Sequence, residues 1–125
     1  TCPLSDIRAN TISAANGTDP VTLTGQYAAK AWVNFNSTGT LAVRQSGNIS
    51  SVTDNGVGLF TLNFTTAMTD ANYAVVGSGG NDSNDLRTIN INFDVAPTTS
   101  AVQINCTSAN STTNDTAYNA VTVTR

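Results

Sequence analysis

The sequence has 125 residues, with eight Asp, one Lys and four Arg, no Glu and no His, and a formal net charge of −3. This length fits one domain, since domains cluster near ~100–150 residues. Thr, Asn, Ser, Val and Ala dominate, and these residues favour strands and turns over helices, so an all-β protein is predicted. A phosphate backbone needs a basic surface, so nucleic-acid binding is not expected. The apolar runs fall well short of the ~20 residues of a membrane-crossing helix, so no membrane insertion is expected.

Residues 1–26 differ from the rest of the chain. The run "TCPLSDIRANTISAANGTDPVTLTG" has scattered apolar residues, two Pro and a Gly-Thr-Asp-Pro break. It predicts an extended arm, with short edge strands at "NTIS" and "VTLTG". Such an arm cannot bury itself alone, so we expect it to pack on a neighbouring chain or domain. Residues 27–125 are predicted to form the β domain.

The first hairpin follows the arm. In "KAWVNFN", Ala31, Val33 and Phe35 alternate with Trp32 and two Asn, which is the period-2 pattern of a half-buried strand. "TLAVRQ" follows after a Ser-Thr-Gly turn and is predicted to be the second strand of this hairpin.

The next two strands, "NISSV" and "GLFTLNF", flank the sequence Asp54-Asn55-Gly56. This polar cluster is either a ligand site or a hairpin turn, and the flanking alternation favours the turn. Asn55 and Gly56 are predicted to be the two residues with positive φ, with Asp54 capping the turn through its side chain. Gly58 is predicted to add a bulge just beyond it.

The remaining strands are predicted at "NYAVVGS", "LRTININFDVA", "SAVQINCTS" and "YNAVTVTR". In the second of these, Ile89, Ile91, Phe93 and Val95 are predicted to face inward. About eight strands joined by short turns predict an antiparallel β-sandwich or jelly-roll-like barrel.

The loop "GSGGNDSNDL" offers the best metal candidates, because Asp82 and Asp85 supply the oxygen donors that calcium prefers. Its spacing does not match a helix-loop-helix calcium site, and a solvated loop is the favoured interpretation. Two interpretations are also open for Cys106, which lies on the apolar face of its strand: a buried inert thiol, which is favoured, or a disulfide with Cys2.

No catalytic residue is predicted, since only Asp is plentiful among the usual acid-base and nucleophilic side chains. No cofactor is predicted either. The Asn- and Thr-rich outward strand faces carry little charge, which suggests either burial against identical subunits or surroundings in which high charge is not needed. Tyr27 and Trp32 flank Lys30 and are candidates for such a contact, because interfaces are rich in aromatic residues; Trp32 is equally explained as ordinary core.

A family resemblance covers about two-fifths of the chain, Ala29 to Ser78. The segments "AKAWVNFN", "NISSVTDNG", "NFTTAM" and "DANY" resemble a module of tailed-bacteriophage virion proteins, especially tail-fibre and related fibre proteins. The stretch "DIRANTISAANGTDPVTL" also looks like the one preceding that module. The departures are small: Ser37 stands where Gly is usual, and Leu59-Phe60 where Asp-Tyr is common.

The resemblance implies a virion structural protein on the surface of the extracellular particle. It implies that the chain forms a homotrimer and that this trimer assembles with other tail or capsid proteins. It implies no catalytic residues. Adhesion to a host glycan or protein is the first hypothesis, and it would follow from a position at the tip of a fibre. Two alternatives remain at this point: a capsid decoration or cement protein that clamps the phage head through its arm, and a secreted carbohydrate-binding module with calcium at Asp82 and Asp85.

Overall fold

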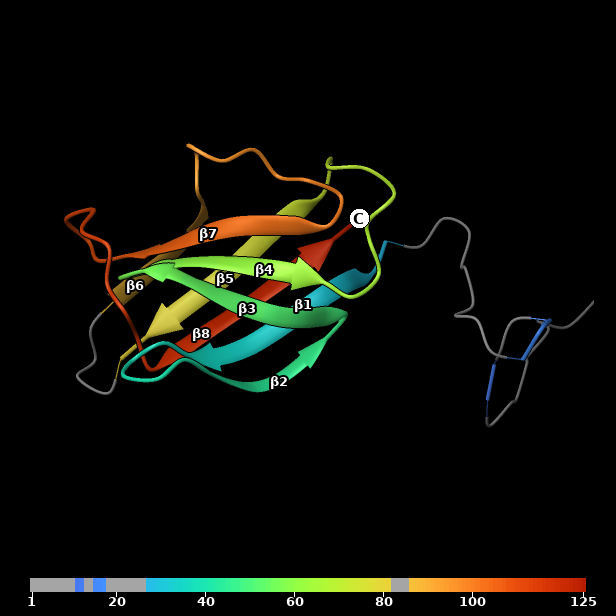
Figure 1. The fold of residues 1–125 in the computed structure, drawn as a ribbon, viewed down its shortest axis with the longest axis horizontal. Helices are drawn as coiled ribbons and strands as arrows, with labels where there is room; N and C mark the ends of the chain where they lie inside the picture. The colour runs from blue at the N-terminus through green and yellow to red at the C-terminus, as the bar shows by residue number, and fades with distance from the viewer. Residues whose placement is uncertain (1–10, 13–14, 18–26, 82–85) are drawn as a thin grey trace, which may run out of the picture.

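A computed structural model describes residues 11–12, 15–17, 27–81 and 86–125. The predicted all-β class is confirmed, because the described residues form eight antiparallel strands in a single, nearly closed, barrel-like sheet (Figure 1). The strands are β1 (Ala29–Asn36), β2 (Ala42–Gly47), β3 (Ile49–Gly56), β4 (Leu59–Phe64), β5 (Ala74–Gly80), β6 (Leu86–Ile91), β7 (Ala101–Thr107) and β8 (Tyr118–Thr124). Their order in the sheet is β2-β1-β8-β5-β6-β7-β4-β3.

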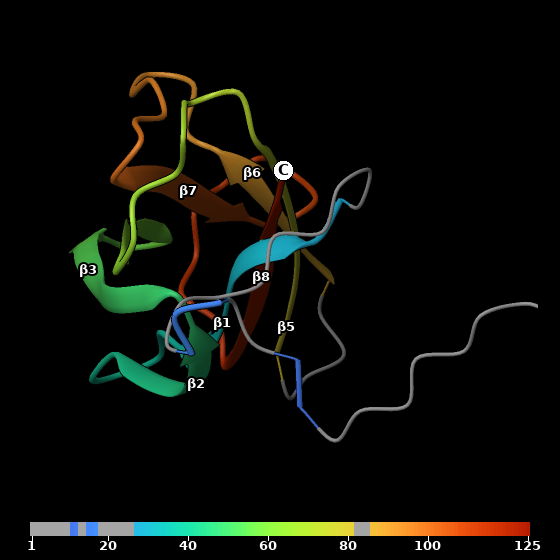
Figure 2. The ribbon, with the colours of Figure 1, turned by 90° about the vertical axis from the view of Figure 1, so that its right-hand side faces the viewer.

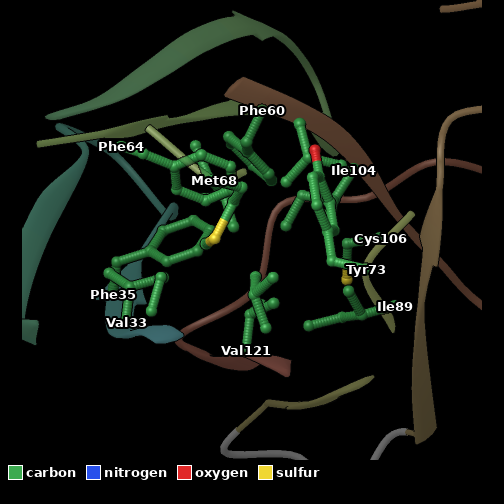
Figure 3. Close-up of a cluster of buried hydrophobic side chains, with 14 residues drawn as sticks. Val33, Phe35, Phe60, Phe64, Met68, Tyr73, Ile89, Ile104, Cys106 and Val121 are labelled. Carbon is green, nitrogen blue, oxygen red and sulfur yellow. The ribbon is translucent and has the colours of Figure 1, made fainter. Parts of the chain in front are cut away.

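The sheet curls so that one face of each long strand points to a shared core (Figure 2). Alternate residues of β1, β4, β7 and β8 are buried, as the period-2 pattern predicts. Figure 3 shows side chains of this face pointing toward one another. The rings of Phe35 and Phe60 are edge to face, with their centroids 5.1 Å apart. The buried core contains Ala31, Val33, Phe35, Phe60, Leu62, Phe64, Met68, Tyr73, Ile89, Val102, Ile104, Cys106, Val121 and Val123.

Asn48 alone joins β2 to β3, although these strands lie at opposite borders of the sheet. Its φ of 54° is left-handed, a conformation that Asn tolerates better than most residues. Its side-chain amide donates to the carbonyls of Lys30 (2.9 Å) and Thr66 (3.0 Å), and its side-chain oxygen accepts from the Thr66 N–H (2.7 Å). This clamp therefore draws the two borders of the sheet together at one end of the barrel.

The antiparallel order gives the barrel two different ends. We call the first the loop end; among the described residues it is formed by residues 37–41, 57–58, 81 and 108–117. The other, the terminal end, contains Tyr27, Asn48, the segments 65–73 and 92–100, and Arg125. In Figure 1 the loop end lies to the left and the C-terminus to the right.

The β3–β4 hairpin is confirmed, but the prediction of its turn residues is wrong in position. β3 continues through Gly56, and the turn lies at residues 57–58. Gly56 (φ 141°) and Gly58 (φ 66°) have a positive φ, and Asn55 does not. The register of the ladder shifts between Asp54 and Gly56, so the irregularity comes before the turn. The predicted cap is present, because the Asp54 carboxylate accepts from the Gly56 N–H at 3.0 Å.

The prediction of an inward-facing Phe93 and Val95 is wrong. β6 ends at Ile91, and these two side chains are 90% and 43% exposed. Asn92 ends the strand, because its side-chain oxygen accepts from the Asp94 N–H (3.1 Å) and its carbonyl from the Val95 N–H (3.3 Å). This local turn takes the place of further strand hydrogen bonds in the sheet, because Asn side chains readily bond to the nearby backbone.

The favoured interpretation of Cys106 is confirmed: it is a free, fully buried thiol on β7. Burial raises its pKa above the ordinary thiol value, with a smaller lowering from the charge of Arg87 and a smaller raising from Asp115. Cys2 lies outside the described residues.

Candidate functional site at the loop end

The loop after β7, residues 108–117, is fixed to the β3–β4 turn through Gly58. The Gly58 N–H donates to the Asp115 carboxylate (2.9 Å), and the Gly58 carbonyl accepts from the Cys106 N–H (2.8 Å). The Asn114 N–H donates in turn to the Cys106 carbonyl (2.9 Å). Two segments far apart in the sequence are thereby held as one hydrogen-bonded unit.

A buried polar cluster fixes the other side of this loop. Ser37, Thr116 and Asn119 are almost fully buried. The Ser37 hydroxyl donates to the Thr116 carbonyl (3.0 Å) and accepts from the Thr116 N–H (2.9 Å). The Asn119 amide donates to the carbonyls of Phe35 (3.2 Å) and Thr116 (3.0 Å). Because buried polar groups are costly when unpaired, this cluster specifies one loop conformation.

Between this loop and β6 lies an open hollow of about 430 Å³. Its lining is polar apart from one alanine, and it consists of Arg87, Ser108, Ala109, Asn110, Thr112 and Asn114. The Arg87 guanidinium donates to the Leu86 carbonyl (3.3 Å) at its edge. Hydroxyl and amide groups of the loop, together with the guanidinium of Arg87 on β6, can recognise a polar ligand by hydrogen bonds.

Few side chains near the loop end could support catalysis or hold a metal ion. The Cys106 thiol is buried with a raised pKa, which disfavours the reactive thiolate. Across the described ranges there is no group of three or more His, Cys, Asp or Glu that could hold a metal ion. Asp82 and Asp85, the predicted calcium candidates, lie outside the described residues. The absence of enzymatic activity and of a cofactor stays a prediction.

The two candidate interface aromatics lie in different places. Tyr27 is 91% exposed at the terminal end, and Trp32 is 41% exposed on the outer face of β1. The interpretation of Trp32 as ordinary core is wrong. Its indole covers Gly47 on β2, where a Cβ would overlap the ring. In the ladder Trp32 pairs with Thr122 on β8, which pairs with Val76 on β5, so the outer face carries an uncharged row across three strands.

The outer face also holds a pair that the sequence does not predict. The Arg44 guanidinium on β2 lies over the Tyr118 ring of β8 at 4.8 Å and donates to the Asn34 side chain (3.2 Å). This cation–π contact fixes an exposed aromatic next to the loop end.

Little in the sequence identifies the residues that shape the loop end. Ser37, Thr116 and Asn119 are ordinary polar residues in a chain rich in Ser, Thr and Asn. The one available signal is Asn119, which occupies an inward position in the alternation of "YNAVTVTR" and therefore needs buried partners.

No protein-family model, curated protein or solved structure matches this chain. The described residues contain no helix that is long and apolar enough to cross a membrane.

Proposed function

We propose that the protein is a bacteriophage virion structural protein, a surface module of the tail-fibre type whose loop end contacts a host glycan or protein. The resemblance of Ala29–Ser78 to fibre proteins is one support. The observation that carries the proposal is the separation of the two ends. Tyr27 and Arg125 both lie at the terminal end, so the chain enters and leaves the barrel opposite the loop end. A particle attached through the predicted N-terminal arm leaves the loop end free.

The loop end has the properties expected of an adhesion surface. Its loops are fixed by the Gly58 and Ser37 hydrogen bonds, and preorganised loops lose little conformational entropy on binding. Its hollow offers hydroxyl and amide groups, the groups that match sugar hydroxyls or a polypeptide backbone.

Assembly with identical chains and with tail or capsid proteins belongs to the same proposal. The row Trp32, Thr122 and Val76 supports it, because an uncharged face can meet its own copy without burying like charges. Sedimentation of the purified full chain tests the homotrimer directly, and a monomer at all concentrations contradicts it.

Adhesion is tested by measuring binding of the labelled protein to susceptible and resistant bacteria. Thr112 is exposed on the rim of the loop-end hollow, and we expect Thr112→Arg to reduce binding to susceptible cells at least about tenfold by steric exclusion. The matched control is Thr99→Arg, at an exposed position of the terminal end, which leaves binding unchanged. Equal lack of binding to both cell types, or equal loss in both variants, contradicts the proposal.

A further inference from the structure

A second and larger hollow, of about 720 Å³, lies at the terminal end. This volume is within the range of about 300–1,000 Å³ that small-molecule sites occupy. The hollow is formed where the start of β1, the clamp residue Asn48, the segment after β4 and the end of β8 meet. Its lining consists of Tyr27, Ala29, Lys30, Asn48, Thr66, Ala67, Met68, Thr69 and Arg125.

Hydrogen bonds fix the walls of this hollow. The Asn48 side chain ties the backbone of Lys30 to that of Thr66 across the seam between β1 and β4. Met68, which is buried, donates its N–H to the Thr99 carbonyl at 2.8 Å. The walls come from four parts of the chain but are held together, so the hollow is formed before any ligand arrives.

The hollow is positively charged in an acidic protein. Two of the four cationic residues in the described part of the chain, Lys30 and Arg125, line it. Arg125 is paired with Asp70, whereas no ion-pair partner of Lys30 lies among the described residues. One positive charge is therefore left for a ligand, and the single charge of a carboxylate balances that of one ammonium group.

The other lining groups suit a ring that has both apolar and hydroxyl faces. The Tyr27 ring is 91% exposed at the rim, and Met68 and Ala67 supply an apolar surface. Thr66 and Thr69 bring hydroxyl groups to the same hollow. An aromatic ring and an apolar floor can pack against the C–H face of a pyranose while hydroxyl groups bond its rim.

We propose that this hollow binds an acidic saccharide, a pyranose ring that carries one carboxylate. Lys30 binds the carboxylate, Tyr27 packs on the ring, and Thr66 and Thr69 bond its hydroxyl groups. The proposal goes beyond adhesion through the loop end, because the site lies at the opposite end of the barrel and depends on neither the virion nor a host cell.

The test is a titration of the full chain, labelled with ¹⁵N, with glucuronate, glucose and acetate in low-salt buffer. We expect glucuronate to shift the amide signals of Tyr27, Lys30 and residues 66–69. Glucose and acetate are expected to bind at least about tenfold more weakly, because each lacks one of the two recognised groups. No shift at these amides, or equal affinity for glucose and glucuronate, overturns the proposal. Acetate binding as tightly as glucuronate also overturns it and indicates a simple carboxylate site.

Two variants locate the site. Lys30→Gln removes the charge and is expected to lower glucuronate affinity at least about tenfold while leaving the weak glucose affinity unchanged. The matched control is Arg44→Gln, which removes one positive charge from the outer face and is expected to leave glucuronate affinity within about twofold. Equal losses in the two variants overturn the proposal, because they indicate a general effect of net charge. Adhesion to cells is a separate measurement, so either proposal can fail without the other.

Discussion

Replacing Gly58 with alanine is expected to damage the loop end more than any other glycine-to-alanine change in its turns. Gly58 has a φ of +66°, and a Cβ built there lies 2.5 Å from the Asn114 nitrogen and 2.7 Å from the Cys106 carbonyl oxygen. Both neighbours are backbone atoms of the segment that carries the β7–β8 loop, so they cannot rotate away as a side chain does. The loop or the turn must shift.

The magnitude has two parts. A non-glycine residue in the left-handed region costs about 1–2 kcal/mol. Moving the turn away from the loop weakens the bonds from Gly58 to Asp115 and from Cys106 to Gly58, at about 1 kcal/mol each. The expected loss in the free energy of unfolding is about 3–4 kcal/mol, which is large against the ~5–15 kcal/mol of an ordinary domain.

Urea unfolding followed by tryptophan fluorescence measures this loss, with Gly39→Ala as the matched control. Gly39 has nearly the same φ, +69°, but nothing lies within 4 Å of a Cβ at that position. The control therefore carries the backbone strain alone and should lose about 1–2 kcal/mol. If the two variants differ by less than about 0.5 kcal/mol, the steric argument and the role of Gly58 in fixing the loop are refuted.

Three further predictions follow from single side chains. Asn48→Ala should lower the free energy of unfolding in urea by about 2–4 kcal/mol, because it adds left-handed strain and removes three hydrogen bonds. Asn48→Gly relieves the strain and should lower it clearly less. Equal losses in the two variants contradict this account. Tyr73→Phe should lower stability by about 1–2 kcal/mol, because its buried hydroxyl donates to the carbonyls of Thr98 and Ala101, and an unchanged unfolding midpoint argues against these bonds. Burial raises the pKa of Cys106, so its stabilising contribution is full below the ordinary thiol value of 9.0 and is lost as the pH rises through the higher folded value. Cys106→Ala should make the free energy of unfolding fall less steeply above pH 9 than it does in the parent, and an identical pH slope in both proteins contradicts the assignment.

The sequence predicts the core well because alternation is a local signal with one physical cause. In β1, β4 and β7 the buried side chains alternate along the strand and are all apolar, and a strand must bury that face. In β8 the same alternation holds, with Asn119 as a polar residue at a buried position. The prediction from alternation fails where a polar side chain forms a hydrogen bond with the neighbouring backbone and turns the chain. Phe93 continues the apolar pattern of β6, but Asn92 turns the chain first.

The turn after β3 is a second place where a local sequence signal does not give the observed structure. Asn55-Gly56 is a strong local hairpin signal, yet the strand continues through it and turns at residues 57–58. The reason lies in distant residues, since Gly58 is held by Asp115 and Cys106. The candidate site was predictable only as a set of polar loops, because the buried bonds of Ser37 and Asn119 join residues about eighty positions apart.

The near-closure of the barrel explains how so uncharged a surface is compatible with a stable protein. Open sheets protect their borders with charge, because exposed backbone groups invite pairing with another chain. Here the two borders, β2 and β3, are consecutive in the chain and are drawn together by Asn48, so little free edge remains at that end. Toward the loop end the borders are exposed, and there the strands carry Arg44 on β2 and Asp54 on β3. Arg44 and Asp54 thus place charge on the part of the two borders that Asn48 does not close, which is where protection against edge pairing is needed.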